Sequence, residues 1–349
     1  MSHLEPNLEL YNLPTKFTDF HGMPYRQLGK TGLRVSAVGL GTWKYGYPET
    51  GDGSRVNEEQ AMEIFDRAWE LGVTFWDTAN RYNLASGNSE RVIGKWLEKN
   101  PDKRRDIIVA SKVWGGMDGR TPNHWGLSRA NIIDSVHACL ERLRIDYMDL
   151  LYFHRPDPLI GLDESLLAVE DLIREGCVRY FAISNADVNT LNEYNAFIEK
   201  NAPLRTKVAA VQNRYDIIRG EDATVPGVLD YAAKNNVSFI AWSPLGQGLL
   251  TGRYNDKNSI GKGDRLFDEK NLGALDNESV MEKLSILAKY ADEFGVSVAT
   301  LTIALMLHIP GMGPVIPSAS NVKQLEANAA AATLDLSDEK ALEILAAIK

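Results

Sequence analysis

The sequence of 349 residues has only two cysteines, Cys139 and Cys177, and no group of cysteines and histidines at metal-ligand spacing. Two isolated cysteines do not form a disulfide scaffold, so reduced thiols are expected. No run approaches the roughly 18 apolar residues of a transmembrane helix. The opening MSHLEPNLEL also lacks the basic and apolar regions of a signal peptide. These absences predict a cytoplasmic protein without a metal site and without a membrane-spanning segment.

An excess of positive charge is also missing from the chain. It holds 38 lysines and arginines against 47 aspartates and glutamates, for a net charge of −9. Nucleic acids and anionic membrane surfaces are bound through clustered basic residues, so neither is expected as a partner. The hydrophobic content of 44% and charged content of 24% are typical of a globular protein. A small molecule is the expected partner, and self-association into a homo-oligomer is left open.

The N-terminal region differs from the rest of the chain. Residues 1–22 are polar and show no periodicity, which predicts an arm. Residues 24–35 alternate around Gly29–Lys30–Thr31–Gly32, which is typical of a β-hairpin. No break in composition follows, so residues 23–349 are expected to form one domain.

Short apolar or β-branched segments alternate with helical patterns over most of the chain. In residues 128–144 the apolar side chains Ile132, Val136, Leu140 and Leu143 recur on one helical face. Further helices are expected at 57–71 and 163–175, and a last helix at 335–348. The expected N-cap residues are Asn57, Ser128 and Asp163, each at the start of its helix. In the helices 57–71 and 163–175, the expected inward residues include Met62, Phe65, Trp69 and Leu167. The eight expected strands are 36–40, 73–77, 106–112, 149–154, 178–184, 207–212, 237–242 and 313–317. This alternation predicts an α/β fold, a single (β/α)8 TIM barrel with an N-terminal hairpin and a C-terminal extra helix.

Polar residues stand at or just beyond the ends of three of these strands: Asp77, with Tyr82 after it, Lys112 and His154. Each alone is typical of a solvated strand end or a turn. In a parallel barrel, however, the carboxyl ends of all strands meet on one face, where active sites lie. The Lys112 ammonium is expected to lower the pKa of the Tyr82 phenol, with Asp77 holding the lysine charged. With His154 donating to the same oxygen, such a site suits protonation of an oxygen while hydride arrives at its carbon.

Five segments, WDTANRY, ASK, LLYFHRPD, VRYFAISN and AWSPLGQGLLTGRY, resemble the aldo-keto reductase superfamily in the expected order, between about Tyr25 and residue 331. The branch is the one that includes potassium-channel β-subunits and bacterial aldo/keto reductases. The resemblance implies a barrel that binds an extended nicotinamide cofactor and reduces carbonyl groups, or runs the reverse oxidation. It also implies a catalytic tetrad at Asp77, Tyr82, Lys112 and His154, with Tyr82 as general acid. Channel β-subunits depart from this tetrad at the histidine.

The same resemblance implies a cofactor site along the strand ends. Ser184 and Asn185, with Gln212, match the nicotinamide carboxamide site, and Trp242 matches the aromatic that stacks on the ring. The implied residues are Gly41, Thr42, Trp43, Asp77, Ser184, Asn185, Gln212, Trp242, Ser243, Pro244, Leu245, Gly248, Arg253, Ile316, Ser318, Ser320, Gln324 and Asn328. Many relatives carry Arg or Lys for the 2′-phosphate where this chain has Asn321, and Lys323 is the candidate for a substitute. NADP(H) is therefore the expected cofactor, with NAD(H) as the alternative.

Aromatic residues after the strands are the candidates for the substrate pocket: Trp43, Tyr45, Trp114, His124 and Trp125. Such rings stack on sugars or enclose an apolar carbonyl compound, and they are equally typical of loop packing. The leading hypothesis is an NAD(P)(H)-dependent alcohol dehydrogenase or carbonyl reductase acting on an aldehyde, ketone or sugar. The alternative is a cofactor-sensing regulatory subunit, similar to channel β-subunits, with weak reductase activity. A third hypothesis is a barrel lyase or isomerase that uses no cofactor.

Overall fold

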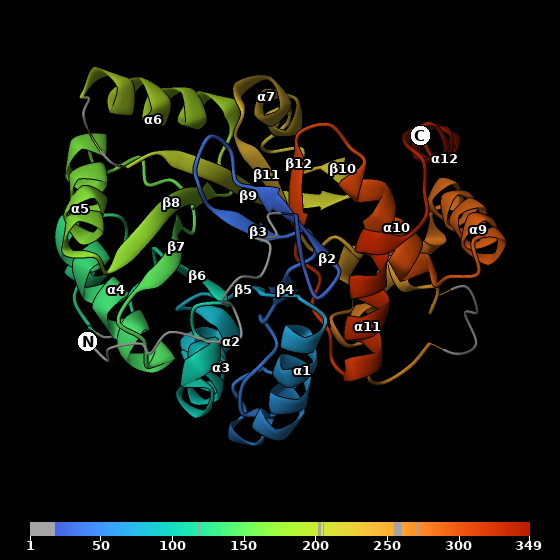
Figure 1. Cartoon of the computed structure of the whole chain (residues 1–349), viewed down its shortest axis with the longest axis horizontal. Helices are drawn as coiled ribbons and strands as arrows, with labels where there is room; N and C mark the ends of the chain where they lie inside the picture. The colour runs from blue at the N-terminus through green and yellow to red at the C-terminus, as the bar shows by residue number, and fades with distance from the viewer. Residues whose placement is uncertain (1–17, 118, 202–203, 205, 255–259, 271) are drawn as a thin grey trace, which may run out of the picture.

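Eight parallel strands form the centre of the molecule (Figure 1). The computed structural model describes residues 18–117, 119–201, 204, 206–254, 260–270 and 272–349. In sheet order the strands are β4 (Leu40–Gly41), β5 (Phe75–Asp77), β6 (Ile108–Val113), β7 (Met148–Phe153), β8 (Val178–Ser184), β9 (Val208–Asp216), β11 (Ser238–Trp242) and β12 (Met312–Val315).

The first and last strands join, so the sheet closes on itself. Val38 bridges Val315 in parallel, and the Gly39 N–H donates to the Val315 carbonyl over 2.8 Å. The Gly41 N–H donates to the Pro317 carbonyl over 3.0 Å. The predicted (β/α)8 barrel is therefore confirmed, with each expected strand present and its ends shifted by a few residues.

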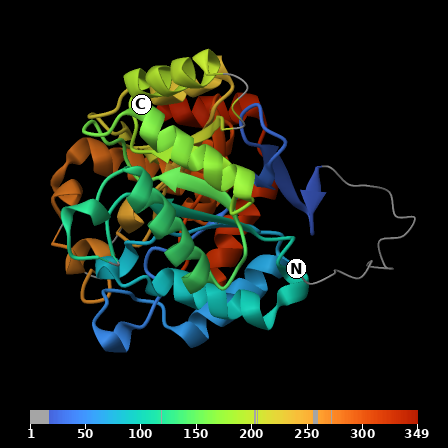
Figure 2. The ribbon, with the colours of Figure 1, turned by 90° about the vertical axis from the view of Figure 1, so that its left-hand side faces the viewer.

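Helices surround the barrel on all sides (Figures 1 and 2). They are α1 (Glu58–Glu70), α2 (Tyr82–Ala85), α3 (Asn88–Lys99), α4 (Arg129–Leu143), α5 (Leu162–Glu175), α6 (Val188–Lys200), α7 (Val228–Asn235), α8 (Arg265–Asp268), α9 (Glu278–Glu293), α10 (Val298–Leu307), α11 (Val322–Ala330) and α12 (Asp338–Ala347). Short 3-10 turns are η2 (Pro48–Thr50), η3 (Pro101–Lys103), η4 (Pro122–His124), η5 (Gly246–Thr251), η7 (Leu272–Asp276) and η8 (Ala331–Thr333). The strand β10 (Gly220–Glu221) pairs with β9 outside the barrel.

A small antiparallel sheet covers the amino-terminal end of the barrel, as Figure 2 shows from the side. The predicted hairpin is present as β2 (Met23–Gln27) and β3 (Arg34–Ser36). A third strand, β1 (Asp19–Phe20), pairs with β2, so the end of the expected arm belongs to this sheet. Residues 1–17 of that arm lie outside the described residues. At the hairpin tip Gly29 has φ +54°, and a Cβ there would lie 2.6 Å from the Ala209 carbonyl oxygen, so only glycine fits.

Two of the three expected N-caps are present. The Asn57 side chain accepts from the Gln60 N–H over 2.9 Å in a full capping box, and Ser128 caps α4. The third expectation is wrong, because the N-cap of α5 is Gly161, two residues earlier, and Asp163 lies in the first turn of the helix. There its carboxylate still interacts favourably with the positive end of the helix dipole.

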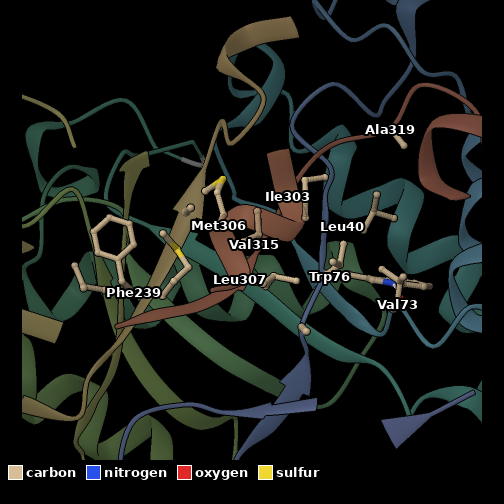
Figure 3. Packing of buried hydrophobic residues seen from close by; sticks show 14 of the residues in the cluster. Leu40, Val73, Trp76, Phe239, Ile303, Met306, Leu307, Val315 and Ala319 are labelled. Carbon is tan, nitrogen blue, oxygen red and sulfur yellow. Dashed lines mark hydrogen bonds between the residues drawn. The ribbon is translucent and has the colours of Figure 1, made fainter. Parts of the chain in front are cut away.

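Apolar side chains fill two layers, one inside the barrel and one between strands and helices. Along β5, Phe75 belongs to the inner layer and Trp76 to the outer layer, as alternation along a strand requires. Trp76 stacks on Phe65 of α1 at 4.5 Å between ring centroids. Figure 3 shows Trp76 with Leu40 and Val73, which belong to the same outer layer. In α1, Met62 and Trp69 are only partly buried, and in α5 Leu167 is 43% exposed, so these expected inward residues lie at the margin of the core.

In the part of the chain that the structure describes, no single helix is long and apolar enough to cross a membrane. The helices α9 and α10 meet that length and composition only as a pair, and they bend by 94° at the break between them. All but the first residue of α10 are buried in the outer layer of the core.

Candidate active site

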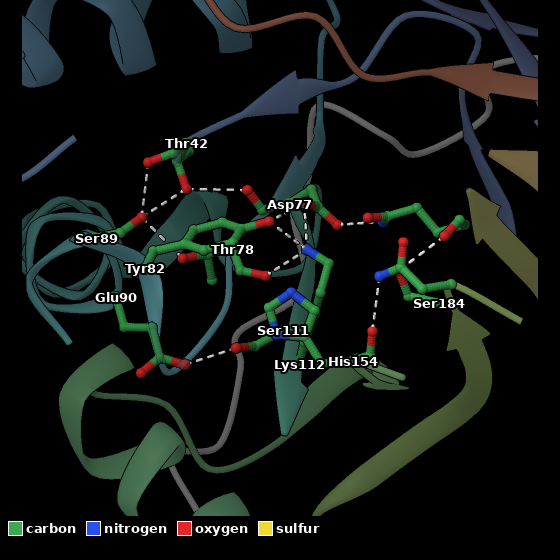
Figure 4. A network of polar contacts seen from close by, with 12 residues as sticks. Thr42, Asp77, Thr78, Tyr82, Ser89, Glu90, Ser111, Lys112, His154 and Ser184 are labelled. Atoms are coloured by element: carbon green, nitrogen blue, oxygen red, sulfur yellow. Dashed lines mark hydrogen bonds and ion pairs between the residues drawn. The ribbon is translucent and has the colours of Figure 1, made fainter. Parts of the chain in front are cut away.

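The ends of β5 and β6 bring three members of the predicted tetrad into contact (Figure 4). The Lys112 Nζ donates to Asp77 Oδ1 over 2.5 Å, to the Tyr82 hydroxyl oxygen over 2.7 Å and to the Thr78 carbonyl over 2.8 Å. The lysine side chain is only 1% exposed. All three ammonium protons are thus directed, and one points at the phenol oxygen.

The charge balance around Tyr82 differs from the expectation drawn from the sequence. Burial raises the pKa of Tyr82 well above its usual value, and the Asp77 carboxylate adds to that shift. The phenol donates to Asp77 Oδ1 over 3.3 Å, and the same carboxylate neutralises the charge of Lys112. The expectation that Lys112 lowers the pKa of Tyr82 is therefore wrong, because the lysine and the aspartate together act as a neutral pair. Tyr82 holds its proton at neutral pH.

His154 follows β7, and its ring faces that of Tyr82 edge-on, with 6.0 Å between centroids. Burial, and after it the charges of Lys112, Arg155 and Arg81, lower the pKa of His154 to about 3. The imidazole is therefore neutral near pH 7. A neutral ring can donate one hydrogen bond to a substrate oxygen without carrying charge into the site.

Strands β8 and β9 support this group from the opposite side of the barrel. The Gln212 Nε2 donates to Asp77 Oδ2 over 2.7 Å, so the residue expected beside the nicotinamide contacts the tetrad directly. The Ser184 hydroxyl donates to the Gln212 carbonyl over 2.7 Å. The Asn185 amide donates to the His154 carbonyl over 2.9 Å, and Asn185 is left-handed, with φ +53°. Ser184 and Asn185 thus connect three strand ends.

A second polar network lies behind the tetrad, and the sequence did not reveal it (Figure 4). Thr42 is buried, and its hydroxyl donates to the Asp77 carbonyl over 2.9 Å. From the first turn of α3, Ser89 contacts the hydroxyls of Thr42 and Thr78 at 2.7 and 2.8 Å. The next residue, Glu90, accepts from the Ser111 hydroxyl over 2.6 Å. One helix turn therefore contacts the side chains of Thr42 and Thr78 on one side and of Ser111, the residue before Lys112, on the other.

The remaining residues of the implied cofactor site lie along the loops that follow β4, β11 and β12. Trp242 ends β11, and among the described residues its buried indole Nε1 has no hydrogen-bond partner. Ser243 and Gly248 have left-handed backbones, Pro244 is buried and Leu245 is half-buried. Arg253 is 60% exposed and pairs with Asp264. On the other side Gly41 packs closely on Ile316: a Cβ at Gly41 would lie 3.1 Å from the Ile316 carbonyl oxygen.

The loop after β12 is held by its own side chains. Asn321, which stands where many relatives have a basic residue, is the N-cap of α11 and accepts from the Gln324 N–H over 2.9 Å. The Gln324 side chain accepts from the Ser320 N–H over 2.8 Å, and Asn328 donates to the Ser318 carbonyl over 3.3 Å. Ser318 and Ser320 are exposed, as a ligand-binding edge requires.

The expected substrate residues separate into two groups. Tyr45 is completely buried and donates to the Ala319 carbonyl over 2.7 Å, so it belongs to the core and its expected place in the pocket is wrong. Trp43 is 39% exposed, with its ring 6.5 Å from that of Tyr82. Trp114 and Trp125 meet edge-on at 5.9 Å, and His124 is half-buried in η4 just before Trp125.

A pocket of about 230 Å³ opens beside the tetrad. Its lining residues are Arg81, Trp114, Gly115, His154, Arg155 and Asn185. The pocket therefore reaches both the tetrad histidine and the Ser184–Asn185 pair, and Trp114 is the predicted substrate residue that it includes.

The sequence pattern of the Aldo/keto reductase family matches residues 37–349, which include every residue of this site. The chain belongs to that family. A protein of Arabidopsis thaliana named as a voltage-gated potassium channel subunit beta is 32% identical over 310 residues, which cover 88% of this chain and 90% of that protein. A protein of Schizosaccharomyces pombe with the same kind of name is 32% identical over 335 residues, 93% and 91% of the two chains. The chain therefore matches these two relatives over nearly their whole length.

Proposed function

We propose that this aldo/keto reductase is an NAD(P)(H)-dependent oxidoreductase that transfers hydride between nicotinamide C4 and the carbonyl carbon of an aldehyde or ketone, or the corresponding alcohol. The observation that carries the proposal is the 2.7 Å hydrogen bond from the buried Lys112 ammonium to the Tyr82 phenol. It lies beside a neutral histidine that lines a pocket.

The strand ends of β8 and β11 fit a nicotinamide cofactor. The buried Trp242 Nε1 has no acceptor among the described residues, and the loop that follows it turns sharply through the left-handed residues Ser243 and Gly248. Ser184 and Asn185 would hold the carboxamide. When bound, the cofactor supplies the hydride, and we favour NADP(H) over NAD(H) because Lys323 stays exposed near the start of α11.

Tyr82 is the proton donor in this proposal. Its raised pKa keeps the phenol protonated until an alkoxide, a far stronger base, develops on the substrate. Lys112 then stabilises the phenolate that remains, through the hydrogen bond already present. Neutral His154 donates to the same substrate oxygen, and Asp77 keeps Lys112 aimed.

The test is a fluorescence titration with NADPH and NADH, followed by a screen of aldehydes, ketones and sugars with the tighter cofactor. We expect binding to quench or shift the nicotinamide emission, and turnover to require Tyr82. A protein that binds neither cofactor would overturn the proposal and favour a cofactor-free lyase or isomerase.

A second candidate function is a cofactor-sensing subunit of a membrane channel, and the names of the two relatives favour it. The intact tetrad favours the enzyme instead, because Tyr82, Lys112 and His154 keep a geometry suited to proton transfer. Co-purification with a stable membrane partner, together with negligible turnover on the whole carbonyl panel, would decide for the subunit.

A further inference from the structure

The pocket beside the tetrad has an unusual charge. Two of its six lining residues, Arg81 and Arg155, carry guanidinium groups, and none of the six carries a carboxylate. Both charges are close enough to His154 to lower its pKa. The pocket next to the reacting oxygen is therefore positive, in a chain whose net charge is −9.

Aromatic rings hold both arginines in place. The Arg155 Cζ lies 3.5 Å from the centroid of Trp114, and the Arg81 Cζ lies 4.4 Å from that of Trp125. A guanidinium stacked by its face keeps its edge N–H groups available for a planar or tetrahedral anion. The two tryptophans contact each other edge-on at 5.9 Å, so the two stacks form one unit.

The loop after β6 also positions Arg81. The Arg81 Nη1 donates to the Gly116 carbonyl over 2.7 Å. A Cβ at Gly115 would lie 2.0 Å from the Arg81 Cδ, so the absence of a side chain there makes room for the arginine. Arg81 thus lies against the backbone on one side and faces the pocket on the other.

Neither guanidinium is neutralised by the protein. Within the described ranges, neither Arg81 nor Arg155 has a carboxylate at ion-pair distance, and Arg155 has no hydrogen-bond acceptor. By contrast, Arg104, Arg142 and Arg265 each pair with an acid. Two uncompensated cations that converge on one pocket are suited to an anionic ligand.

We propose that the carbonyl substrate of this enzyme carries a second, anionic group, a carboxylate or a phosphate, which Arg81 and Arg155 bind while the carbonyl oxygen lies at Tyr82 and His154. The assignment rests on the proposed function of the same site. The pocket of about 230 Å³ corresponds to on the order of eight water molecules, which indicates a small substrate. A neutral sugar would leave both guanidinium groups without a partner.

The test compares matched pairs of substrates that differ in one charged group. For carboxylate the pair is 4-oxobutanoate and butanal, and for phosphate it is glycolaldehyde phosphate and glycolaldehyde. For each compound kcat/KM is measured, and binding to the full-length protein is measured by calorimetry with and without cofactor. The variants are Arg155→Met and Arg81→Met. The control is Arg179→Met, an arginine that stacks on Tyr147 at the opposite end of the barrel, at the start of β8.

We expect at least one anionic member to exceed its neutral partner by about tenfold or more in both kcat/KM and affinity, the effect of a charge-assisted hydrogen bond. Arg155→Met and Arg81→Met should abolish this preference for the anionic compound, and Arg179→Met should keep it. Equal values within both pairs, with turnover present, would overturn the anionic substrate and leave the reductase standing. Selective binding of an anion without turnover would support the anion site and overturn the reductase.

Discussion

The Gln212 Nε2 donates a hydrogen bond of 2.7 Å to Oδ2 of Asp77, a residue 135 positions earlier in the chain. The other carboxylate oxygen accepts from Lys112. Both side chains are buried, so both oxygens of Asp77 are satisfied without solvent. Gln212 thereby holds the carboxylate that aims Lys112 at Tyr82, and it acts as a positioning residue for the tetrad.

Replacing Gln212 by leucine should destabilise the protein by about 1.5–3 kcal/mol, because it leaves a buried carboxylate oxygen without a donor. Urea unfolding measures this loss. The matched control is Gln324→Leu, since Gln324 is exposed and should cost less than about 1 kcal/mol. Equal losses in the two variants would show that the bond to Asp77 adds nothing to stability.

Replacing Tyr82 by phenylalanine should lower kcat for carbonyl reduction by about 10²–10⁴-fold, the usual contribution of a positioned general acid. Cofactor affinity should not change. Because the raised pKa keeps the phenol protonated, the wild-type rate of reduction should show no loss below pH 10 that is due to Tyr82. The control is Tyr45→Phe, which should lose stability but keep its turnover, because Tyr45 is a core residue. Full turnover in folded Tyr82→Phe would exclude the mechanism.

Much of the barrel and its tetrad could be predicted from the sequence because both depend on local pattern. Short apolar strands end at Asp77, one residue after Lys112 and just before His154, and the parallel topology then brings these residues together. Tyr45 was misplaced for the same reason. Its position after β4 is typical of a pocket residue, and only the packed structure shows its hydroxyl bound to Ala319 inside the core.

Contacts between distant residues could not be predicted in this way. Nothing near Gln212 in the sequence indicates that its amide reaches Asp77. In the sequence, Ser89 and Glu90 are typical polar residues of a helix start, although their side chains bind the hydroxyls of Thr78 and Ser111 next to the tetrad. The direction of the Tyr82 pKa shift depends on the balance of burial, carboxylate and ammonium, which three-dimensional distances determine.

His154 should make stability depend on pH. Its pKa is about 3 in the folded protein and near 6.5 when unfolded, so between these values the unfolded chain binds more protons. The contribution of the neutral His154 ring to the free energy of unfolding is fully present above pH 6.5 and is lost as pH falls toward 3. Between pH 7.5 and 4.5 the wild type should lose on the order of 2–3 kcal/mol more than His154→Gln, by urea unfolding at both values. Parallel losses in the two proteins would contradict this assignment.

The buried pair of Glu90 and Arg142 should be critical for folding. The Arg142 Nε donates to Glu90 Oε2 over 2.6 Å, and the glutamate is completely buried. Glu90→Leu removes the buried carboxylate that pairs with Arg142 and should cost about 3–5 kcal/mol. On the same helix, Glu98 pairs with Arg144 at the surface, so Glu98→Leu should cost less than about 1 kcal/mol. A thermal or urea unfolding series compares them, and a cost for Glu90→Leu as small as the control would refute the role of the buried pair.

Cofactor preference should depend on Lys323 rather than on the residue before α11. The Asn321 side chain is occupied as the N-cap, whereas Lys323 is exposed one residue into the helix, where an anion is also favoured by the helix dipole. Lys323→Met should therefore weaken NADPH binding by about tenfold, or about 1.4 kcal/mol, and leave NADH binding unchanged. Asn321→Ala should lower stability by about 1 kcal/mol and keep the NADPH-to-NADH affinity ratio. Fluorescence titrations with both cofactors measure the ratios, and an unchanged ratio in Lys323→Met would assign the preference to another residue.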